Sequence, residues 1–263
     1  MLTLVAGREA HLRNLVHGLA RSSTLPAELI VASMDGRRPA LPEAPFRVRV
    51  IDALGDHELP FAAARNSAAL VANGEGLVFL DVDCIPSRGL VGAYETALTR
   101  CDGLAMGGVR YLRPGTAREN WTEADLTALS DAHPGRPEPG AGLEPTERYD
   151  LFWSLSFGVR RSTLLGGLGG FDESFSGYGG EDTDLGFTAR ARGVPLAWLG
   201  GATCFHQHHE TERMDRHAAS IVANARRFHE KWGEWPMQAW LAQLASRGAI
   251  DWSPAEGEIA VTG

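Results

Sequence analysis

The sequence is poor in cysteine, with only Cys84, Cys101 and Cys204 spread along 263 residues. An odd number of isolated cysteines does not build a disulfide framework, so reduced thiols are expected. Long hydrophobic runs are also missing, because no segment approaches the roughly 20 apolar residues of a membrane span. The apolar run at the N-terminus is too short for a signal peptide, and a cytoplasmic location is predicted.

The chain also lacks an excess of basic residues. Its 25 lysines and arginines are outnumbered by 33 aspartates and glutamates, which gives a formal net charge of −8. Binding to a nucleic-acid backbone needs a basic surface, so no nucleic-acid partner is expected. Hydrophobic residues make up 44% of the chain and charged residues 22%, as in ordinary globular proteins.

Short apolar runs alternate with helical patterns in the first half, which is typical of a doubly wound α/β sheet. The expected strands are residues 2–5, 29–32, 48–51 and 77–80. The expected helices are residues 10–20, 61–71 and 89–100. The last of these strands is apolar at every position, as expected for a central strand, and it runs into Asp81. Ligands of open α/β sheets bind at the carboxyl ends of strands, so this half is predicted to bind a nucleotide.

The second half begins with a change of composition. Residues 113–150 are rich in proline, glycine, glutamate and arginine, and an insertion or a flexible loop, which often serves as a lid, is predicted there, with a helix only near 121–129. Beyond it, residues 185–192 are expected to form a helix that ends at Gly193. A strand over 195–199 and amphipathic helices toward the C-terminus complete the prediction.

Two carboxylates, Asp81 and Asp83, follow the apolar strand directly. The period of two in an extended chain puts both on one side, where hard oxygen ligands suit Mg²⁺ or Mn²⁺. His206 and His208 have the same spacing, and their imidazoles favour Mn²⁺ over Mg²⁺. The alternatives are a polar turn, a solvated histidine loop or a zinc site with Cys204, which lacks the usual paired cysteine.

The densest charge is the run of Glu181, Asp182 and Asp184 behind a turn that ends in Gly180. A helix cap explains a single aspartate but does not require three carboxylates. A closely bound ligand and a general base explain the cluster better.

Three further side chains have two interpretations each. The Arg65 guanidinium in the 61–71 helix could reach a diphosphate, although an exposed helical arginine is the default. Tyr178 and Trp153 could stack on sugars, although core aromatics are the commoner case.

Together these motifs resemble the GT-A fold nucleotide-sugar glycosyltransferases of the family 2 type, with a second half similar to the β-1,4-galactosyltransferases. Residues 61–66 and 79–86 resemble the donor half, and residues 169–173 and 177–182 resemble the acceptor half. The resemblance runs to about His209 and implies a single α/β domain with a mixed central sheet and helices on both faces. It divides the chain into a donor-binding half (1–110), a flexible loop or insertion (111–150), an acceptor-binding and catalytic half (151–210) and C-terminal helices with a tail (211–263).

The resemblance also implies roles on the donor side. Asp83, His206 and His208 would hold Mn²⁺ or Mg²⁺, and Asp81 would contact the ribose or the metal shell. Arg65 belongs to the same donor site.

On the acceptor side, Asp182 would be the catalytic base and Glu181 would hold the acceptor hydroxyl. Tyr178, Trp153 and Gly180 would line the acceptor site, and Tyr178 stands where galactosyltransferases have a tryptophan.

One departure concerns the nucleobase. Relatives usually have an acidic pair after the second strand, whereas this chain has Asp35 alone, and Asp52 after the next strand is a second candidate. Uridine is expected from the resemblance only.

The implied reaction is inverting transfer of a sugar from a UDP-sugar to a carbohydrate, glycolipid or small-molecule acceptor. A haloacid-dehalogenase-like phosphatase is the alternative enzyme, although its motif usually lies on an N-terminal strand. A binding module without turnover is the non-enzymatic alternative, which the retained charges of Asp83, Asp182 and His206 argue against. The tryptophans Trp232, Trp235 and Trp240 could contact a membrane surface, but packing against the sheet is preferred.

Overall fold

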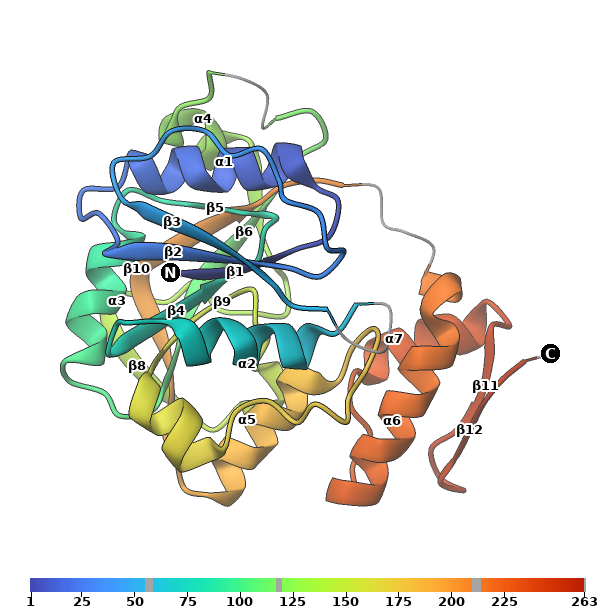
Figure 1. Cartoon of the computed structure of the whole chain (residues 1–263). Coiled ribbons are helices and arrows are strands. Elements are labelled where there is room, and N and C mark those ends of the chain that lie inside the picture. The colour runs from blue at the N-terminus through green and yellow to red at the C-terminus, as the bar shows by residue number, and fades with distance from the viewer. Residues whose placement is uncertain (55–58, 117–119, 210–213, 263) are drawn as a thin grey trace.

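A computed structural model describes residues 1–54, 59–116, 120–209 and 214–262. Ten strands form one mixed sheet in the order β3-β2-β1-β4-β9-β6-β10-β5, with β7 beside β6 and β8 beside β10. Helices cover both faces of this sheet (Figure 1). The predicted α/β architecture is confirmed.

The first half is a parallel arrangement that follows the hydrophobic pattern closely. Its strands are β1 (Leu2–Val5), β2 (Glu28–Ser33), β3 (Arg47–Asp52) and β4 (Gly76–Leu80). Its helices are α1 (Glu9–Ala20), α2 (Phe61–Val71) and α3 (Leu90–Leu98). The apolar side chains of α1 and α3 lie together in one hydrophobic core cluster. The alanine-rich α2 packs in a second core cluster, where its small side chains allow a close approach. All four predicted strands and three predicted helices are confirmed within two residues at each end.

The second half adds strands of both directions. They are β5 (Cys84–Pro86), β6 (Leu104–Leu112), β9 (Ser156–Arg160) and β10 (Leu196–His206). β9 is antiparallel to both β4 and β6, and β10 is parallel to β6. β10 is therefore longer than the predicted 195–199 strand, because it continues past a register shift between Leu199 and Cys204 and pairs with β5.

Of the two alternatives for residues 113–150, the flexible loop is wrong for most of the segment, and the insertion stays a prediction. The segment contains α4 (Glu123–Ala128), β7 (Ser130–Ala132), β8 (Gly142–Thr146) and a short 3₁₀ helix (Tyr149–Leu151). Thr122 and Asp125 form a capping box that starts α4. Among the described strands β8 pairs with β10 alone, and as an edge strand it tolerates Pro145.

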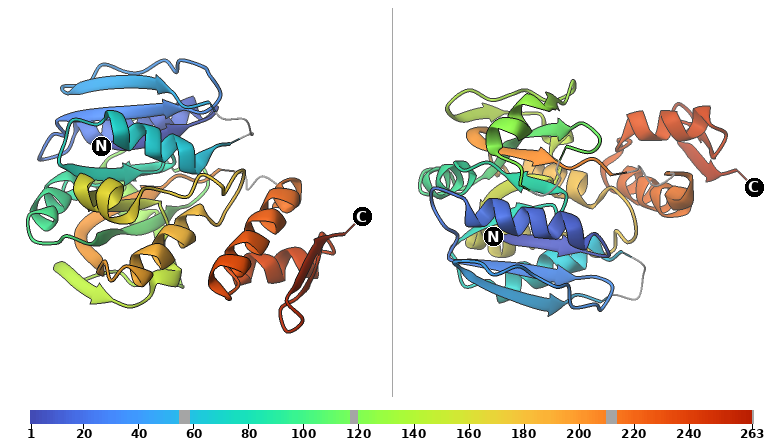
Figure 2. Two further views of the ribbon diagram at one scale, coloured as in Figure 1. Left: turned by 60° about the horizontal axis from the view of Figure 1, so that its bottom comes forward. Right: turned by 90° about the horizontal axis from the view of Figure 1, so that it is seen from above.

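A separate apolar cluster organises the C-terminal residues. They form α6 (Ala218–Trp232), α7 (Gln238–Ser246) and the hairpin of β11 (Ile250–Ser253) and β12 (Glu258–Val261). This part lies to one side of the sheet in all views (Figure 2). It meets the rest of the chain through α5 (Glu181–Ala191), where the Phe187 and Phe228 rings lie 4.8 Å apart.

The prediction that the three C-terminal tryptophans pack against the sheet is therefore wrong. Trp232 joins the aromatic cluster between α5 and α6, and Trp235 stacks on His229 at 4.1 Å. Trp240 stacks on Tyr178 and stays 37% exposed. Among the described residues, no helix combines the length and apolar character needed to cross a membrane.

Candidate active site

The functional residues gather at one edge of the sheet. β1, β4, β6 and β10 run in the same direction, so their carboxyl ends meet there. Asp81 and Asp83 follow β4, and His206 ends β10 directly opposite Cys84. β9 runs the other way, which brings Ser154 and the residues before it to the same edge.

A metal-binding geometry is present at this edge. Asp83, His206 and His209 each offer a ligand atom, and these atoms lie within 4.8 Å of one another. The Asp83 Oδ1 atom is buried and has no hydrogen-bond partner among the described residues. Burial lowers the pKa of His206 to about 4, so this imidazole is neutral and available as a ligand at physiological pH. One carboxylate and two imidazoles suit Mn²⁺ or a related ion.

The prediction that His206 and His208 both bind the metal is wrong for His208. His208 is exposed and is not part of the cluster, whereas His209 Nε2 lies 3.5 Å from Asp83 Oδ2. The strand ends at His206, so the alternation of side chains does not continue beyond it. Gln207 turns inward instead, where its side chain accepts a hydrogen bond from Asn14 at 2.7 Å.

Two residues of the N-terminal segment reach the same aspartate and were not predicted. Arg8 forms an ion pair with Asp83, and His11 Nδ1 lies 3.7 Å from Asp83 Oδ1. Burial is the main cause that lowers the pKa of His11. The position of Arg8 just after β1 was the only sequence signal, since the carboxyl end of β1 lies beside that of β4.

Arg65 is buried, so the interpretation as an exposed helical arginine is wrong. Its side chain is 6% exposed, and Nη1 donates to Glu181 Oε1 at 2.7 Å. Nη2 lies 3.9 Å from Asp81 Oδ1. Arg65 therefore ties α2 to the first turn of α5 and to the end of β4.

The pKa of Asp81 is raised to about 7. Burial is the main cause, and the charges of Asp83 and Asp182 add to it while Arg65 opposes it. A carboxyl group with this pKa is about half protonated at neutral pH, even with Arg65 beside it, and a further cation would favour its ionised form.

Asp182 is half-buried at the start of α5 and is held by two backbone groups. Its Oδ1 accepts from Thr183 N at 2.7 Å, and its Oδ2 accepts from Ser154 N at 3.3 Å. Burial, and then the charge of Glu181, raises the pKa of Asp182 to about 6. The carboxylate is thus fixed in orientation and more basic than an ordinary aspartate.

The helix can begin at this point because of Gly180. Its φ of 98° is a left-handed conformation that favours glycine, and an added Cβ would lie 3.2 Å from the Phe175 ring. The observed role of Gly180 is conformational, and contact with an acceptor stays a prediction.

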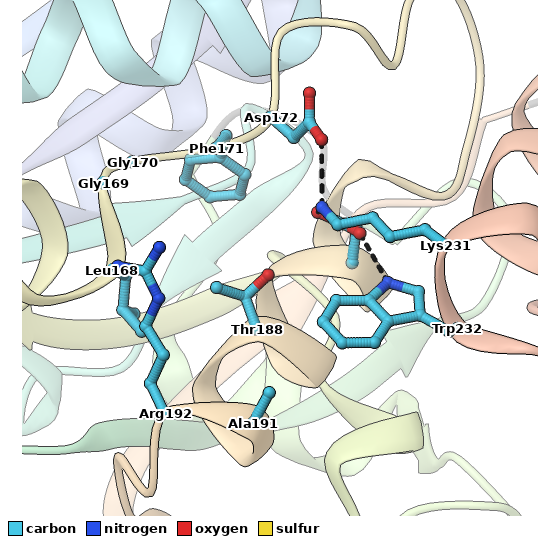
Figure 3. A pocket seen from close by; sticks show the side chains of 11 residues that line it. Leu168, Gly169, Gly170, Phe171, Asp172, Thr188, Ala191, Arg192, Lys231 and Trp232 are labelled. Carbon is cyan, nitrogen blue, oxygen red and sulfur yellow. Dashed lines mark hydrogen bonds and ion pairs between the residues drawn. The ribbon is translucent and has the colours of Figure 1, made fainter.

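The acidic run divides between two sides of α5. Asp184 is 1% exposed and accepts from Lys231 Nζ at 2.9 Å and Trp232 Nε1 at 2.7 Å. These three residues line a pocket of ≈ 370 Å³ between α5 and α6 (Figure 3). Asp182 lies roughly 200° around the helix from Asp184, which takes it to the sheet edge. Asp184 is therefore a structural residue of the first turn of α5.

The two nucleobase candidates lie at the carboxyl ends of β2 and β3. Asp35 Oδ2 accepts from Gly7 N at 2.9 Å, and this hydrogen bond is the main cause that lowers the pKa of Asp35. Asp52 ends β3 in register with Ser33 and is exposed. Both are therefore at the edge that carries Arg8 and Asp83.

The two predicted stacking residues are half-buried and already have ring partners. Tyr178 stacks on His217 at 4.9 Å and on Trp240 at 5.7 Å. Trp153 contacts the His133 ring edge-on at 5.2 Å, and the guanidinium of Arg136 lies 4.9 Å from its centroid. Both rings also keep part of their surface exposed, and contact with an acceptor stays a prediction.

Solved structures with the same architecture are glycosyltransferases. TarS 1–349 from S. aureus matches with a TM-score of 0.56 and 12% identity over 85% of this chain and 63% of that chain. GalNAc-T7, solved with UDP, GalNAc and Mn²⁺, matches with a TM-score of 0.57 and 12% identity over 93% of this chain and 56% of that chain. The chain has the GT-A fold. Identities this low establish the fold of the chain but neither its activity nor its substrates.

Curated relatives share short or distant similarity with the GT-A chain, and no protein-family model matches it. Validoxylamine A glucosyltransferase from Streptomyces hygroscopicus subsp. jinggangensis is 32% identical over 80 residues, 30% of this chain and 18% of that protein. O-antigen biosynthesis protein RfbC from Myxococcus xanthus is 27% identical over 216 residues, 78% of this chain and 17% of that protein. The chain thus spans less than a fifth of the length of these relatives.

Proposed function

We propose that the protein is an inverting, metal-dependent glycosyltransferase of the family 2 type that moves a sugar from a UDP-sugar to an acceptor hydroxyl. The observation that carries the proposal is the placement of Asp182 at the sheet edge that holds Asp83, His206 and His209. Residues 1–110 would bind the donor and residues 151–210 the acceptor. UDP and UDP-GlcNAc in the solved GT-A neighbours support uridine as the base.

The metal in this proposal is Mn²⁺, held by Asp83, His206 and His209. The residues fit such an ion because Asp83 Oδ1 has no hydrogen-bond partner among the described residues and the imidazole of His206 is neutral. When bound, the ion would neutralise charge on the departing diphosphate. Arg8, whose side chain is 32% exposed beside Asp83, places a further positive charge near the phosphates.

The nucleoside in this proposal lies over the carboxyl ends of the first strands. Asp35 and Asp52 offer carboxylate acceptors for the base or the ribose hydroxyls, and the Gly7 N–H fixes the orientation of Asp35. Asp81 serves the ribose or the shell of the metal. Its pKa near 7 leaves it about half ionised at neutral pH, and a bound metal ion would favour the ionised form.

Asp182 is the general base of the proposed reaction. Its carboxylate takes the proton of the acceptor hydroxyl while that oxygen bonds to the anomeric carbon and the bond to the diphosphate oxygen breaks. A pKa near 6 keeps it mostly ionised at neutral pH yet basic enough to accept a proton. A single displacement inverts configuration, so an α-linked donor gives a β-linked product.

Glu181 has a different role from the one that the resemblance implies. Its side chain is 7% exposed, and one oxygen is bound by Arg65. We assign Glu181 and Arg65 to positioning, because together they fix the first turn of α5 that carries Asp182. Tyr178 and Trp153 remain the proposed acceptor platforms.

The proposal is tested by Mn²⁺-dependent release of UDP from a panel of UDP-sugars, with and without acceptor sugars. The wild type should release UDP, and Asp83→Asn should reduce the rate by at least about tenfold, the order seen when metal sites are disturbed. Asp102→Asn is the control, because its carboxylate is 78% exposed at a surface ion pair with Arg160.

Two results would contradict the proposal. UDP binding without any hydrolysis or transfer would indicate a binding module. Hydrolysis of simple phosphate esters without a nucleotide sugar would indicate a phosphatase.

A further inference from the structure

Arg136 is a buried cation that the chain leaves incompletely bonded. It lies between β7 and β8 and is 8% exposed. Its guanidinium carbon is 4.9 Å from the Trp153 ring centroid and 4.8 Å from that of Trp198. Nη2 contacts Met106 Sδ at 3.8 Å, while Nη1 is buried without a hydrogen-bond partner in the described part of the chain.

Aromatic rings do not complete the bonding of a guanidinium. They cover its faces, whereas its five N–H donors point outward in its plane. A buried arginine stays charged, and a buried charge is unfavourable unless it is paired and hydrogen-bonded. Arg65 shows the usual solution, with Glu181 at 2.7 Å. Across the described residues, no carboxylate forms an ion pair with Arg136, so its natural partner is an anion from outside the chain.

The position of Arg136 places that anion beside the proposed base. Trp153, which stacks on the guanidinium, directly precedes Ser154, whose N–H binds Asp182. Burial lowers the pKa of Arg136, and Asp182 is among the groups that oppose this effect, after the larger contributions of Tyr111, Cys204 and Tyr94. The ring of His133, three residues before Arg136, meets Trp153 on the same side of the site.

We propose that Arg136 binds an anionic group, a carboxylate or a phosphate ester, of a sugar substrate held beside Asp182. This inference rests on the proposed glycosyl transfer and narrows its substrate class to acidic sugars. The anion belongs to one of the two sugars that meet at Asp182, the donor sugar or the acceptor. The donor diphosphate is assigned to the Asp83 and Arg8 side of the site.

Binding of matched neutral and acidic sugars tests this proposal, with titration calorimetry in the presence of Mn²⁺. The donor arm compares UDP-glucuronate with UDP-glucose. The acceptor arm saturates the protein with UDP and compares methyl β-glucuronide and glucose 6-phosphate with methyl β-glucoside. In one arm the wild type should bind an acidic sugar at least tenfold more tightly than its neutral counterpart, because a charge-assisted hydrogen bond to a buried arginine is strong.

Arg136→Met removes the charge but keeps an apolar side chain between the tryptophans. This variant should bind the acidic and the neutral sugar about equally, while its Kd for UDP alone changes less than twofold. Arg136→Lys keeps the charge without the planar donors and should give an intermediate preference. If the methionine variant does not fold by circular dichroism, the lysine variant decides.

No preference in either arm of the wild type would overturn the proposal. A preference that persists unchanged in the variants would also overturn it. Failure of the wild type to bind UDP at all would instead contradict the proposed glycosyl transfer, so the two claims can be told apart.

Discussion

Buried charge is handled differently on the two sides of α5. Toward α6, the Asp184 carboxylate is satisfied on both oxygens by Lys231 and Trp232. Toward the sheet edge, three buried charged side chains each keep one polar atom without a hydrogen-bond partner among the described residues: Asp83, Glu181 and Arg136. Each such atom costs about 1–3 kcal/mol. We infer that the chain itself satisfies the buried charge of Asp184, while substrates satisfy the buried charges at the sheet edge.

Removal of a paired buried cation should give the largest loss of stability. Arg65→Met leaves Glu181 buried without its ion-pair partner, which typically costs about 3–5 kcal/mol. Arg136→Met is the matched variant, because it removes a buried cation that no carboxylate pairs with in the described chain. We expect the free energy of unfolding to change by about 1 kcal/mol or less there. Urea unfolding followed by circular dichroism measures both, and equal losses would break the contrast.

Metal affinity distinguishes the two neighbouring histidines at the sheet edge. His209→Ala should weaken Mn²⁺ binding by about 10–100-fold, because His209 shares the cluster with Asp83 and His206. His208→Ala is the control, since this side chain is exposed outside the cluster. Titration calorimetry with Mn²⁺ alone gives both affinities. A stronger effect of His208→Ala would restore the i, i+2 assignment.

The link between α5 and α6 should affect stability and leave donor binding intact. Lys231→Met removes one partner of the buried Asp184, and we expect a loss of about 1–3 kcal/mol. Arg190→Met breaks an exposed pair with Glu234 nearby and should cost no more than about 1 kcal/mol. Thermal unfolding compares the two variants. A weaker Kd for UDP in Lys231→Met would contradict the division between the two sides of α5.

The pH dependence of transfer should show the smallest of these effects. The base must be ionised, so the rate is expected to rise with pH through about 6, the pKa of Asp182, and to level off above it. Glu181→Gln removes a negative charge that raises this pKa, and the acid limb should move to lower pH. Asp172→Asn, at the pocket between α5 and α6, should leave the limb in place. A shift of the acid limb in Asp172→Asn but not in Glu181→Gln would contradict the coupling between Glu181 and Asp182.

The parallel half of the sheet was predictable because its signals are local. Strands such as β4 are apolar throughout, and the alanine-rich α2 begins and ends where its pattern does. The placement of Asp81 and Asp83 at a ligand-binding edge also follows from a strand that ends in carboxylates. These features depend on a few consecutive residues, so composition and periodicity reveal them.

Other features depend on contacts between distant segments. The 113–150 segment resembles a loop by composition, yet β7 and β8 obtain backbone partners from β6 and β10. The choice of His209 over His208 follows from where β10 ends, and Arg136 enters the site only because β7 and β8 position it. Neither hydrophobic periodicity nor a short sequence motif indicates such contacts.

The central claim concerns Asp182, and the most direct measurement is the turnover of Asp182→Asn with its donor affinity. Asparagine keeps the shape of the side chain, and its single oxygen can still accept one of the two backbone N–H groups, but it cannot take up the hydroxyl proton. We predict a fall in kcat of about 10²–10⁴ with the Kd for the UDP-sugar unchanged within about twofold. Near-normal turnover by Asp182→Asn, with intact folding, would contradict its role as the base.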